Sequence, residues 1–305
     1  MAAKATVQPE SACTKKFTLN NGTKMPAVGL GTYRIRNGDV IMKVVEYALE
    51  NGYRMFDTAA VYGNEVHLRE AFKKLLPKYE LEREDIFITT KLSPADHGGS
   101  AVVERAYQKS LDHLGLDYVD LYLIHFPGTA RIMSTDPRNE ALRDQTWSAM
   151  AELYDAGRVN AIGVSNFTVK HLDTLMLHNH GVVPAVNQVE WHPYYHQTEL
   201  LEFCRKNEIQ LQAYCSLGGA SSDNYGLLDN TVVKKVARKL NVTSAQVLLQ
   251  WALQEDIAII PKSTSGERIK ENIELNFTIS PEDMNALSKL GTKSHKYAWD
   301  PTEIA

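Results

Sequence analysis

The chain lacks the features that mark several classes of protein. Its 305 residues include only three cysteines, Cys13, Cys204 and Cys215, and none of them forms a Cys-x-x-Cys pair. This pattern argues against a disulfide framework and a zinc site and is typical of a reducing compartment, so we expect a cytoplasmic protein without a bound metal. No apolar run approaches the roughly 20 residues that span a bilayer. The net charge of −4 comes without a basic block, which argues against nucleic acid or an anionic membrane as a partner.

The first residues of the chain indicate a tail followed by a hairpin. Residues 1–16 are mixed and polar and have no apolar core of a signal peptide, so we expect a loose N-terminal tail. Residues 17–28 alternate around Asn21-Gly22, a pair that supplies the positive φ angles of a tight hairpin. Such a hairpin would plug the N-terminal end of the main fold. Because no linker or low-complexity segment follows, we interpret residues 17–305 as a single domain.

From residue 28 onward, short apolar runs alternate with amphipathic segments. The predicted strands are 28–31, 54–56, 86–90, 121–124, 161–164, 185–189, 211–214 and 257–260. The predicted helices are about 39–49, 64–76, 100–115, 143–156, 232–240, 243–251, a segment from 265 and another from 281. Eight strand–helix repeats predict an α/β fold of the (β/α)8 TIM-barrel type.

The alternative fold is an open doubly wound sheet. That fold favours Gly-x-Gly-x-x-Gly after its first strand, whereas Gly29-Leu-Gly31 is followed here by Thr-Tyr-Arg. In the barrel, the long connections at 127–140, 216–230 and from 291 would rim the C-terminal face.

Polar residues follow three of the predicted strands. Asp57, Lys91 and His125 stand at the ends of the second, third and fourth strands, and Tyr62 follows Asp57 after a short loop. Because parallel strands of a barrel end on one face, we expect the four side chains to meet. Asp57 and Lys91 would need each other if buried. Lys91 would also lower the pKa of the Tyr62 phenol below its usual value of about 10, so that Tyr62 can donate a proton near neutral pH.

His125 would donate a hydrogen bond to a substrate oxygen beside Tyr62. Taken singly, these residues have plainer interpretations as a structural ion pair, a rim tyrosine and a core histidine. Their joint placement favours chemistry at an oxygen that gains negative charge.

A second cluster follows the last predicted strand. Lys262, Ser263, Thr264 and Arg268 crowd the start of a helix, where cations and backbone amides favour a phosphate. Thr264 and Glu267 also fit the spacing of a capping box. Without a ligand, the same residues would be a solvated helix face.

The chain resembles the aldo-keto reductase family over nearly all of residues 17–290. The motifs that carry the resemblance are Gly29-Leu-Gly-Thr-Tyr33, Asp57-Thr-Ala-Ala-Val-Tyr-Gly-Asn-Glu65, Thr90-Lys91, Asp120-Leu-Tyr-Leu-Ile-His125, Gly163-Val-Ser-Asn-Phe167, Asn187-Gln-Val-Glu190 with His192-Pro193, and Ile260-Pro-Lys-Ser263 through Glu271-Asn272. The resemblance implies a monomeric oxidoreductase that reduces aldehydes or ketones to alcohols by hydride transfer from NADPH.

The resemblance also implies a role for each site residue. Tyr62 would be the proton donor, Lys91 and Asp57 would tune it, and His125 would orient the carbonyl. The implied cofactor-binding residues are Thr32, Tyr33, Asp57, Ser165, Asn166, Gln188, Tyr214, Ser216, Leu217, Lys262, Ser263, Thr264, Arg268, Glu271 and Asn272. The carbonyl substrate would contact Tyr33, Tyr62, His125, Phe126 and Trp299.

Some residues depart from the family pattern. Phe126 replaces the Trp that often follows the catalytic His, Trp191 lies in the motif after the sixth strand, and Cys215 follows Tyr214. The loop at 127–140 is also shorter than in the mammalian aldose reductase-like enzymes. These differences lie where substrate preference is set.

Two other classes of function stay open at this point, and a third is disfavoured. Barrels of the resembled family also serve as lens crystallins and as ion-channel subunits, so this chain could instead be a catalytically modest structural, crystallin-like protein or an NADPH-sensing binding protein. NADPH oxidation by aldehydes would discriminate these roles from catalysis. A Schiff-base aldolase would use Lys91 as nucleophile and would be trapped by borohydride. A short-chain dehydrogenase is disfavoured because the chain contains no Tyr-x-x-x-Lys.

Overall fold

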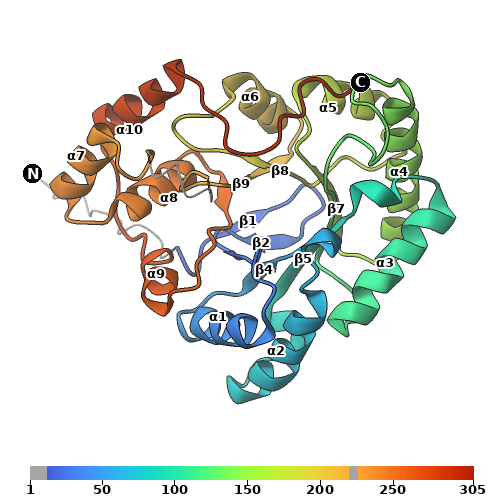
Figure 1. Cartoon of the computed structure of the whole chain (residues 1–305), viewed down its shortest axis with the longest axis horizontal. Coiled ribbons are helices and arrows are strands. Elements are labelled where there is room, and N and C mark those ends of the chain that lie inside the picture. The colour runs from blue at the N-terminus through green and yellow to red at the C-terminus, as the bar shows by residue number, and fades with distance from the viewer. Residues whose placement is uncertain (1–11, 220–225) are drawn as a thin grey trace, which may run out of the picture.

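The structure, a computed structural model that describes residues 12–219 and 226–305, is a barrel of parallel strands surrounded by helices (Figure 1). Within these residues, eight strands form one sheet in chain order. They are β3 (Leu30–Gly31), β4 (Met55–Asp57), β5 (Phe87–Leu92), β6 (Leu121–Ile124), β7 (Ala161–Ser165), β8 (Val186–Glu190), β9 (Gln210–Tyr214) and β10 (Ala258–Ile259). A parallel bridge between Val28 and Ile259 connects the first strand region to the last. The predicted (β/α)8 fold is therefore confirmed.

The helices that cover the barrel are largely those that the apolar periodicity predicted. They are α1 (Gly38–Glu50), α2 (Glu65–Lys78), α3 (Ser100–Leu114), α4 (Arg138–Asp155), α5 (Val169–Leu177), α6 (Thr198–Lys206), α7 (Thr231–Leu240), α8 (Ser244–Gln254), α9 (Gly266–Glu271) and α10 (Pro281–Ser288). Helices α5 and α6 were not predicted, because segments of nine residues carry few periodic positions. None of the helices in 12–219 and 226–305 has the length and apolar character needed to cross a bilayer.

Helix α4 corrects the predicted loop at 127–140. The helix begins at Arg138, so the connection after β6 ends at Pro137. The prediction was wrong here because the first turn of α4 is mostly exposed and polar, which delays the apolar pattern. The chain turns into the helix at Asp136, whose carbonyl accepts a hydrogen bond from the Asn139 amide at 3.0 Å.

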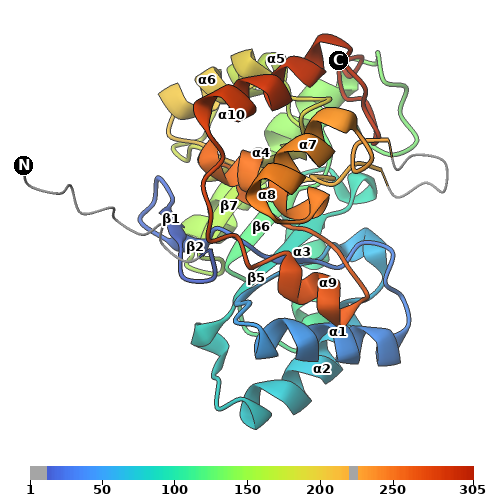
Figure 2. The ribbon, with the colours of Figure 1, turned by 90° about the vertical axis from the view of Figure 1, so that its left-hand side faces the viewer.

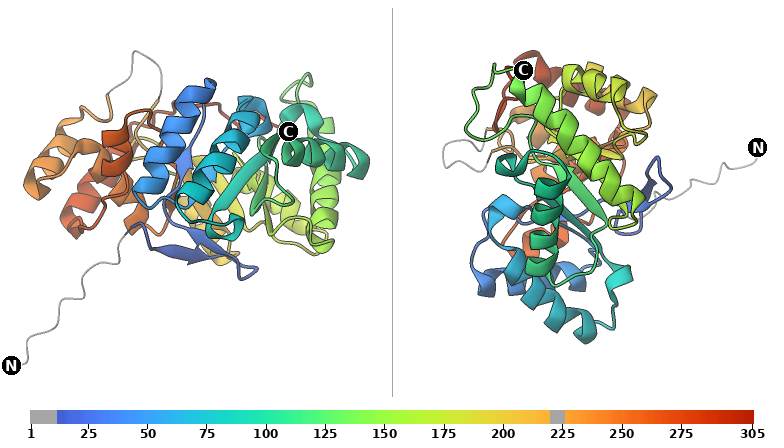
Figure 3. Two further views of the ribbon diagram at one scale, coloured as in Figure 1. Left: turned by 90° about the horizontal axis from the view of Figure 1, so that it is seen from below. Right: turned by 90° about the vertical axis from the view of Figure 1, so that its right-hand side faces the viewer.

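A hairpin closes the N-terminal end of the barrel, as predicted. Strands β1 (Lys16–Thr18) and β2 (Lys24–Pro26) pair antiparallel around Gly22, which has a φ of 87°. Buried Leu19 and Met25 pack into the cluster that fills the barrel interior. Figure 2 and Figure 3 show the hairpin at one end of the barrel. Residues 1–11 of the predicted tail lie outside the described residues, and Ala12, which follows them, is buried.

Two of the long connections contact the C-terminal tail. The Ala305 amide donates to the Ser134 carbonyl at 2.8 Å, which joins the end of the chain to the loop after β6. The loop after β9 approaches the tail at Gly219, where a Cβ atom would stand 2.7 Å from the Tyr297 ring. The rest of the predicted connection 216–230 includes residues 220–225, which lie outside the described residues. These contacts place the tail beside the other two segments, as expected for a common rim.

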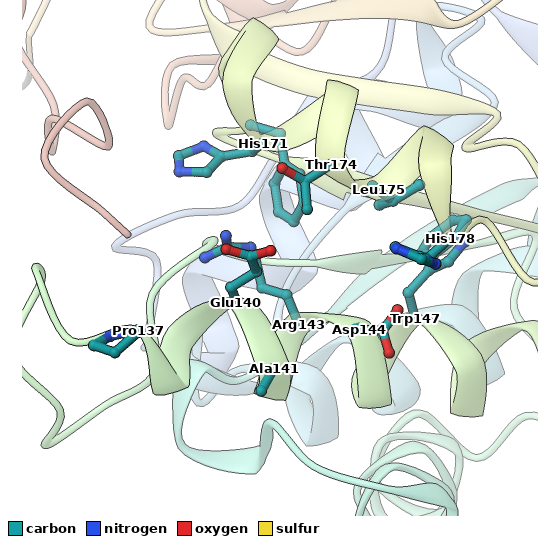
Figure 4. A pocket seen from close by; sticks show the side chains of 11 residues that line it. Pro137, Glu140, Ala141, Arg143, Asp144, Trp147, His171, Thr174, Leu175 and His178 are labelled. Atoms are coloured by element: carbon teal, nitrogen blue, oxygen red, sulfur yellow. The ribbon is translucent and has the colours of Figure 1, made fainter.

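A cavity of about 320 Å³ lies between α4 and α5. Figure 4 shows the side chains of the two helices facing each other across it. None of the predicted site residues lines it, but Arg143 and His171 do. The same two residues bind the end of the tail, because Arg143 donates to the Ala305 carbonyl oxygen at 2.6 Å and His171 Nε2 lies 3.1 Å from the Ile304 oxygen.

Two buried histidines predict a loss of stability in mild acid. Burial lowers the pKa of His97 and of His171 to about 4, from an ordinary value of 6.5. Between these pH values, the unfolded chain binds protons that the folded chain does not, so stability is complete above about pH 6.5 and is lost as pH falls toward 4. We expect each histidine to lower the free energy of unfolding by up to about 3 kcal/mol at about pH 4.

Urea unfolding at about pH 7.5 and pH 5 measures this effect. The variant His97→Gln should unfold more easily at neutral pH but lose less additional stability on acidification than the parent chain. Equal losses on acidification in the two proteins would contradict the assignment.

Candidate active site

A buried ion pair lies at the C-terminal ends of β4 and β5. The Lys91 ammonium nitrogen is 2.7 and 2.8 Å from the two carboxylate oxygens of Asp57 and 2.8 Å from the Thr58 carbonyl. The exposed fractions of the two side chains are 0% for Lys91 and 3% for Asp57. Each charge therefore depends on the other for compensation, as the sequence predicted.

Tyr62 places its hydroxyl beside this pair. It ends a short 3₁₀ helix, Ala60–Tyr62, which begins after Thr58 and Ala59, the two residues that follow β4. Its hydroxyl oxygen lies 3.4 Å from the Lys91 nitrogen, and its ring centroid is 5.6 Å from that of His125. The structure thus brings together all four residues that the strand ends predicted, Asp57, Tyr62, Lys91 and His125.

The predicted direction of the Tyr62 pKa was wrong. Burial, followed by the Asp57 carboxylate, raises the pKa of Tyr62 well above 10. The prediction considered Lys91 alone and left out the burial of the phenol and the Asp57 carboxylate, which together outweigh the attraction of the nearby ammonium. The phenol consequently carries its proton at neutral pH, as a proton donor must.

His125 is a neutral imidazole in this site. Burial, followed by the Lys91 charge, lowers the pKa of His125 to about 3. Its buried Nδ1 has no hydrogen-bond partner in the part of the chain that the structure describes. A neutral imidazole can donate one hydrogen bond, so His125 can orient an oxygen next to Tyr62 but holds no additional proton for it.

Aromatic side chains surround Tyr62 and His125. The Tyr33 ring centroid is 5.1 Å from that of Tyr62, and the Trp299 centroid is 6.3 Å from His125 and 6.2 Å from Phe126. Tyr33 and Trp299 are 41% and 56% exposed. The five residues expected to contact a substrate therefore form one continuous aromatic surface.

Hydroxyl and amide groups follow at the ends of β7, β8 and β9. Asn166 donates to the His125 carbonyl at 2.9 Å and accepts from the Tyr214 hydroxyl at 2.5 Å. The Ser165 hydroxyl donates to the Gln188 carbonyl at 2.8 Å, and Gln188 Nε2 donates to Asp57 at 2.8 Å. The Thr32 hydroxyl donates to the main-chain carbonyl oxygen of Asp57 at 2.8 Å. These groups form one hydrogen-bonded set around the ion pair.

Cations gather after β10, next to the β3 end. Lys262 and Arg268 both reach the surface of the protein. The pKa of Lys262 is lowered, first by the partial loss of water around its amine and then by the positive charges of Arg268 and Arg34. The other expected cofactor-binding residues of this region lie on the same segment. Ser263 and Thr264 precede α9, Glu271 ends it, and Asn272 follows and is buried. Ser216 and Leu217 follow β9, and the Ser216 hydroxyl donates to the Ala213 carbonyl at 3.4 Å.

The start of α9 corrects a predicted cap. Ser265, and not Thr264, is the N-cap, because its side chain accepts from the Arg268 amide at 3.4 Å. The Ser263 hydroxyl accepts from the Ser265 amide at 3.1 Å, which forms a local turn over Thr264 and moves the start of the helix by one residue. The predicted Thr264–Glu267 capping box is therefore absent.

A model of the aldo/keto reductase family matches residues 27–292. The chain belongs to the aldo/keto reductase family. It is 40% identical over 287 residues to the glyoxal reductase of Bacillus subtilis, a match that covers 94% of this chain and 96% of that protein. It is 37% identical to glycerol 2-dehydrogenase (NADP(+)) of Saccharomyces cerevisiae, over 95% of this chain and 97% of that one. The solved aldose reductase of Schistosoma japonicum superimposes with a TM-score of 0.83 at 34% identity, covering 93% of this chain and 94% of its own.

Reasoning from sequence missed three residues in this aldo/keto reductase. Arg34 joins the cation cluster, and its guanidinium lies 5.3 Å from the Tyr33 ring centroid. Gln212 accepts from Gln188 at 2.7 Å inside the barrel. Glu190, at the end of β8, is a charged side chain with 0% exposure. The sequence did contain a signal for two of them. Gln212 lies inside a predicted buried strand and Glu190 directly follows one, and polar residues are rare at such positions.

Proposed function

We propose that this aldo/keto reductase reduces aldehydes or ketones with NADPH and that Tyr62 donates the proton. Membership in the family supports carbonyl reduction. The observation that carries the proposal is the Tyr62 hydroxyl, which lies 3.4 Å from a lysine that is itself paired with a buried aspartate. The neutral imidazole of His125 borders the same space.

The described residues fit a phosphorylated dinucleotide. Lys262, Arg268 and Arg34 gather three positive charges, which suits the 2′-phosphate and pyrophosphate. Asn166, Ser165 and Gln188 supply amide and hydroxyl groups next to Tyr214, which suits a carboxamide beside an aromatic ring. Thr32, Ser216, Leu217, Ser263, Thr264, Glu271 and Asn272 complete the proposed binding residues. A bound NADPH supplies the hydride.

The residues of this chain would then control the oxygen of the carbonyl. His125 donates a hydrogen bond that holds the oxygen near the Tyr62 hydroxyl. As negative charge develops on that oxygen, Tyr62 transfers its proton to it. Lys91, held in place by Asp57 and the Thr58 carbonyl, stabilises the phenolate that remains. In the reverse direction the phenolate accepts a proton from the alcohol.

The geometry does not favour Lys91 as a Schiff-base nucleophile. Its ammonium faces both Asp57 oxygens, the Thr58 carbonyl and the Tyr62 hydroxyl, so its protons are directed at acceptors. A nucleophilic amine must be unprotonated.

The predicted monomeric state and cytoplasmic location stay predictions.

Loss of NADPH absorbance in the presence of a panel of aldehydes, sugars, quinones and ketones tests the proposal. We expect turnover with at least one class of carbonyl. Failure of every carbonyl to oxidise NADPH, while NADPH still binds, would favour a structural or NADPH-sensing protein.

The variant Arg268→Ala should weaken the use of NADPH selectively. A charge-assisted hydrogen bond to phosphate contributes about 1.5–3 kcal/mol, so we expect KM for NADPH to rise about 10-fold to 100-fold. KM for NADH, which has no 2′-phosphate, should change less than about twofold. Lys270→Ala, on the same helix and exposed, is the matched control. Equal effects on the two cofactors would contradict the phosphate assignment.

A further inference from the structure

Glu190 is a buried carboxylate that the proposed reaction does not use. It ends β8, two residues after Gln188, and its side chain is 0% exposed. Oε1 accepts from His192 Nε2 at 3.0 Å and from the Tyr297 amide at 2.6 Å. Oε2 accepts from Lys296 Nζ at 2.8 Å and from the Ala298 amide at 2.9 Å. Four donors therefore converge on one carboxylate, and three of them come from the C-terminal tail.

The donor from the barrel side is fixed in its orientation. His192 Nδ1 accepts from the Tyr195 amide at 3.1 Å, so that nitrogen carries no proton. The remaining proton lies on Nε2, which points at Glu190. Burial acts to raise the pKa of Glu190, but the hydrogen bonds from His192 and Lys296 outweigh it and lower that pKa to about 2. The carboxylate is thus charged at neutral pH.

The contact holds the backbone that leads directly into Trp299. Two consecutive amides, those of Tyr297 and Ala298, bind the two oxygens of Glu190 and set the direction of the chain at that point. Trp299 is the next residue, and it reaches His125 and Phe126. Beyond it, the tail is attached again at Ile304 and Ala305 by His171 and Arg143.

Trp299 has little other support. It is 56% exposed, whereas Trp147, Trp191 and Trp251 are each 1% exposed. Because so much of the Trp299 side chain is exposed, its position depends mainly on the position of its backbone. The nearest contact that fixes this backbone is the hydrogen bond from the Ala298 amide to Glu190. The position of Trp299 in the aromatic surface therefore depends on Glu190, which is not itself part of that surface.

We propose that Glu190 is a positioning residue that holds the tail across the barrel mouth and so sets selectivity for carbonyl substrates large enough to reach Trp299. The inference rests on the proposed function, because it takes Tyr62 and His125 as the place where the carbonyl binds. Small aldehydes, which lie at Tyr62 and His125 alone, do not depend on the contact. Aromatic aldehydes stack against Trp299 and do.

Tryptophan fluorescence tests the contact without any assay of activity. Acrylamide reports the accessibility of Trp299, because the other three tryptophans are buried. We expect Glu190→Gln to increase quenching, since an amide nitrogen cannot accept from the tail donors. Lys296→Met should increase it less, and Lys293→Met, an exposed position of the same tail, should leave it unchanged. The added quenching should vanish in a Trp299→Phe background.

Steady-state kinetics with two aldehydes test the effect on selectivity. An aromatic contact contributes about 0.5–1.5 kcal/mol, so Glu190→Gln should lower kcat/KM for para-nitrobenzaldehyde about threefold to tenfold, mainly through KM. The kcat and KM for propanal should change less than about twofold. Trp299→Ala should lower kcat/KM for para-nitrobenzaldehyde at least as much, and adding Glu190→Gln to it should cause no further loss with that aldehyde.

The outcomes separate this inference from the proposed function. Turnover of neither aldehyde by the parent protein would overturn the proposed function, and unchanged quenching in Glu190→Gln would overturn the contact with the tail. Equal losses with both aldehydes, additive to those of Trp299→Ala, would show a purely structural role and would also overturn the inference. If Glu190→Gln fails to fold, Lys296→Met with its control Lys293→Met decides by the same measurements.

Discussion

Replacement of Tyr62 by phenylalanine is expected to lower kcat for aldehyde reduction by about 10²-fold to 10⁴-fold, the usual contribution of a positioned general acid. The phenol is the group that can deliver a proton to the oxygen, because His125, with a pKa of about 3, carries no extra proton at neutral pH. Phenylalanine keeps the ring contacts with Tyr33 and His125 and removes only the hydroxyl next to Lys91.

The measurement compares kcat with the affinity for NADPH, obtained by fluorescence titration. The affinity should stay within about threefold of the parent value, since the proposed phosphate contacts at Lys262 and Arg268 are untouched. Tyr79→Phe is the matched control, because that tyrosine donates to Glu50 on the surface. A Tyr62→Phe protein that keeps more than about a tenth of the parental kcat would refute the proton-donor assignment.

The variant Lys91→Met is expected to have the largest effect on stability. Among the described residues, it would leave the buried Asp57 carboxylate with one side-chain hydrogen bond, that from Gln188. Breaking a buried ion pair in this way costs about 3–5 kcal/mol. Catalysis should also fall, because the phenolate that forms on Tyr62 would lose its neighbouring positive charge.

A double-mutant cycle tests whether the cost arises from the unpaired charge. Urea unfolding at neutral pH gives the free energies for Lys91→Met, Asp57→Asn and the double variant. The double variant should be more stable than Lys91→Met, because it carries no buried charge at either position. Activity should not return with stability, since the double variant still lacks the ammonium. A cost below about 1 kcal/mol for Lys91→Met would show that the pair is better solvated than its burial implies.

The four central residues could be predicted because one geometric rule connects them. Strands of a parallel barrel end on the same face, so Asp57, Lys91 and His125 had to converge once their strands were recognised. Tyr62 could be placed with them because it ends the short 3₁₀ helix Ala60–Tyr62, soon after β4. The hairpin could be predicted for a local reason, the backbone preference of Asn21-Gly22.

Other features depend on contacts that no local pattern records. The pKa of Tyr62 was predicted in the wrong direction because the burial of the phenol and its distance from Asp57 are set by the folded structure, and both raise that pKa. Glu190 was quoted as part of a motif, but three of its four partners lie more than a hundred positions later in the chain. The cap at Ser265 depends on a turn made by Ser263, which competes with the Thr264–Glu267 spacing.

The hairpin before the first strand has a consequence for the opposite end of the barrel. Gln212 Nε2 contacts the sulfur of Met25, in the hairpin, at 3.8 Å, and that of Met55 at 3.6 Å. Through Gln188, the same glutamine connects to the carboxylate of Asp57. The ion pair of Asp57 and Lys91 is thus connected, through Gln188 and Gln212, to Met25 of the hairpin at the other end of the barrel. A relative with a different hairpin sequence and no matching change at these glutamines would therefore have altered electrostatics around Asp57. None of its substituted hairpin residues would contact the ion pair.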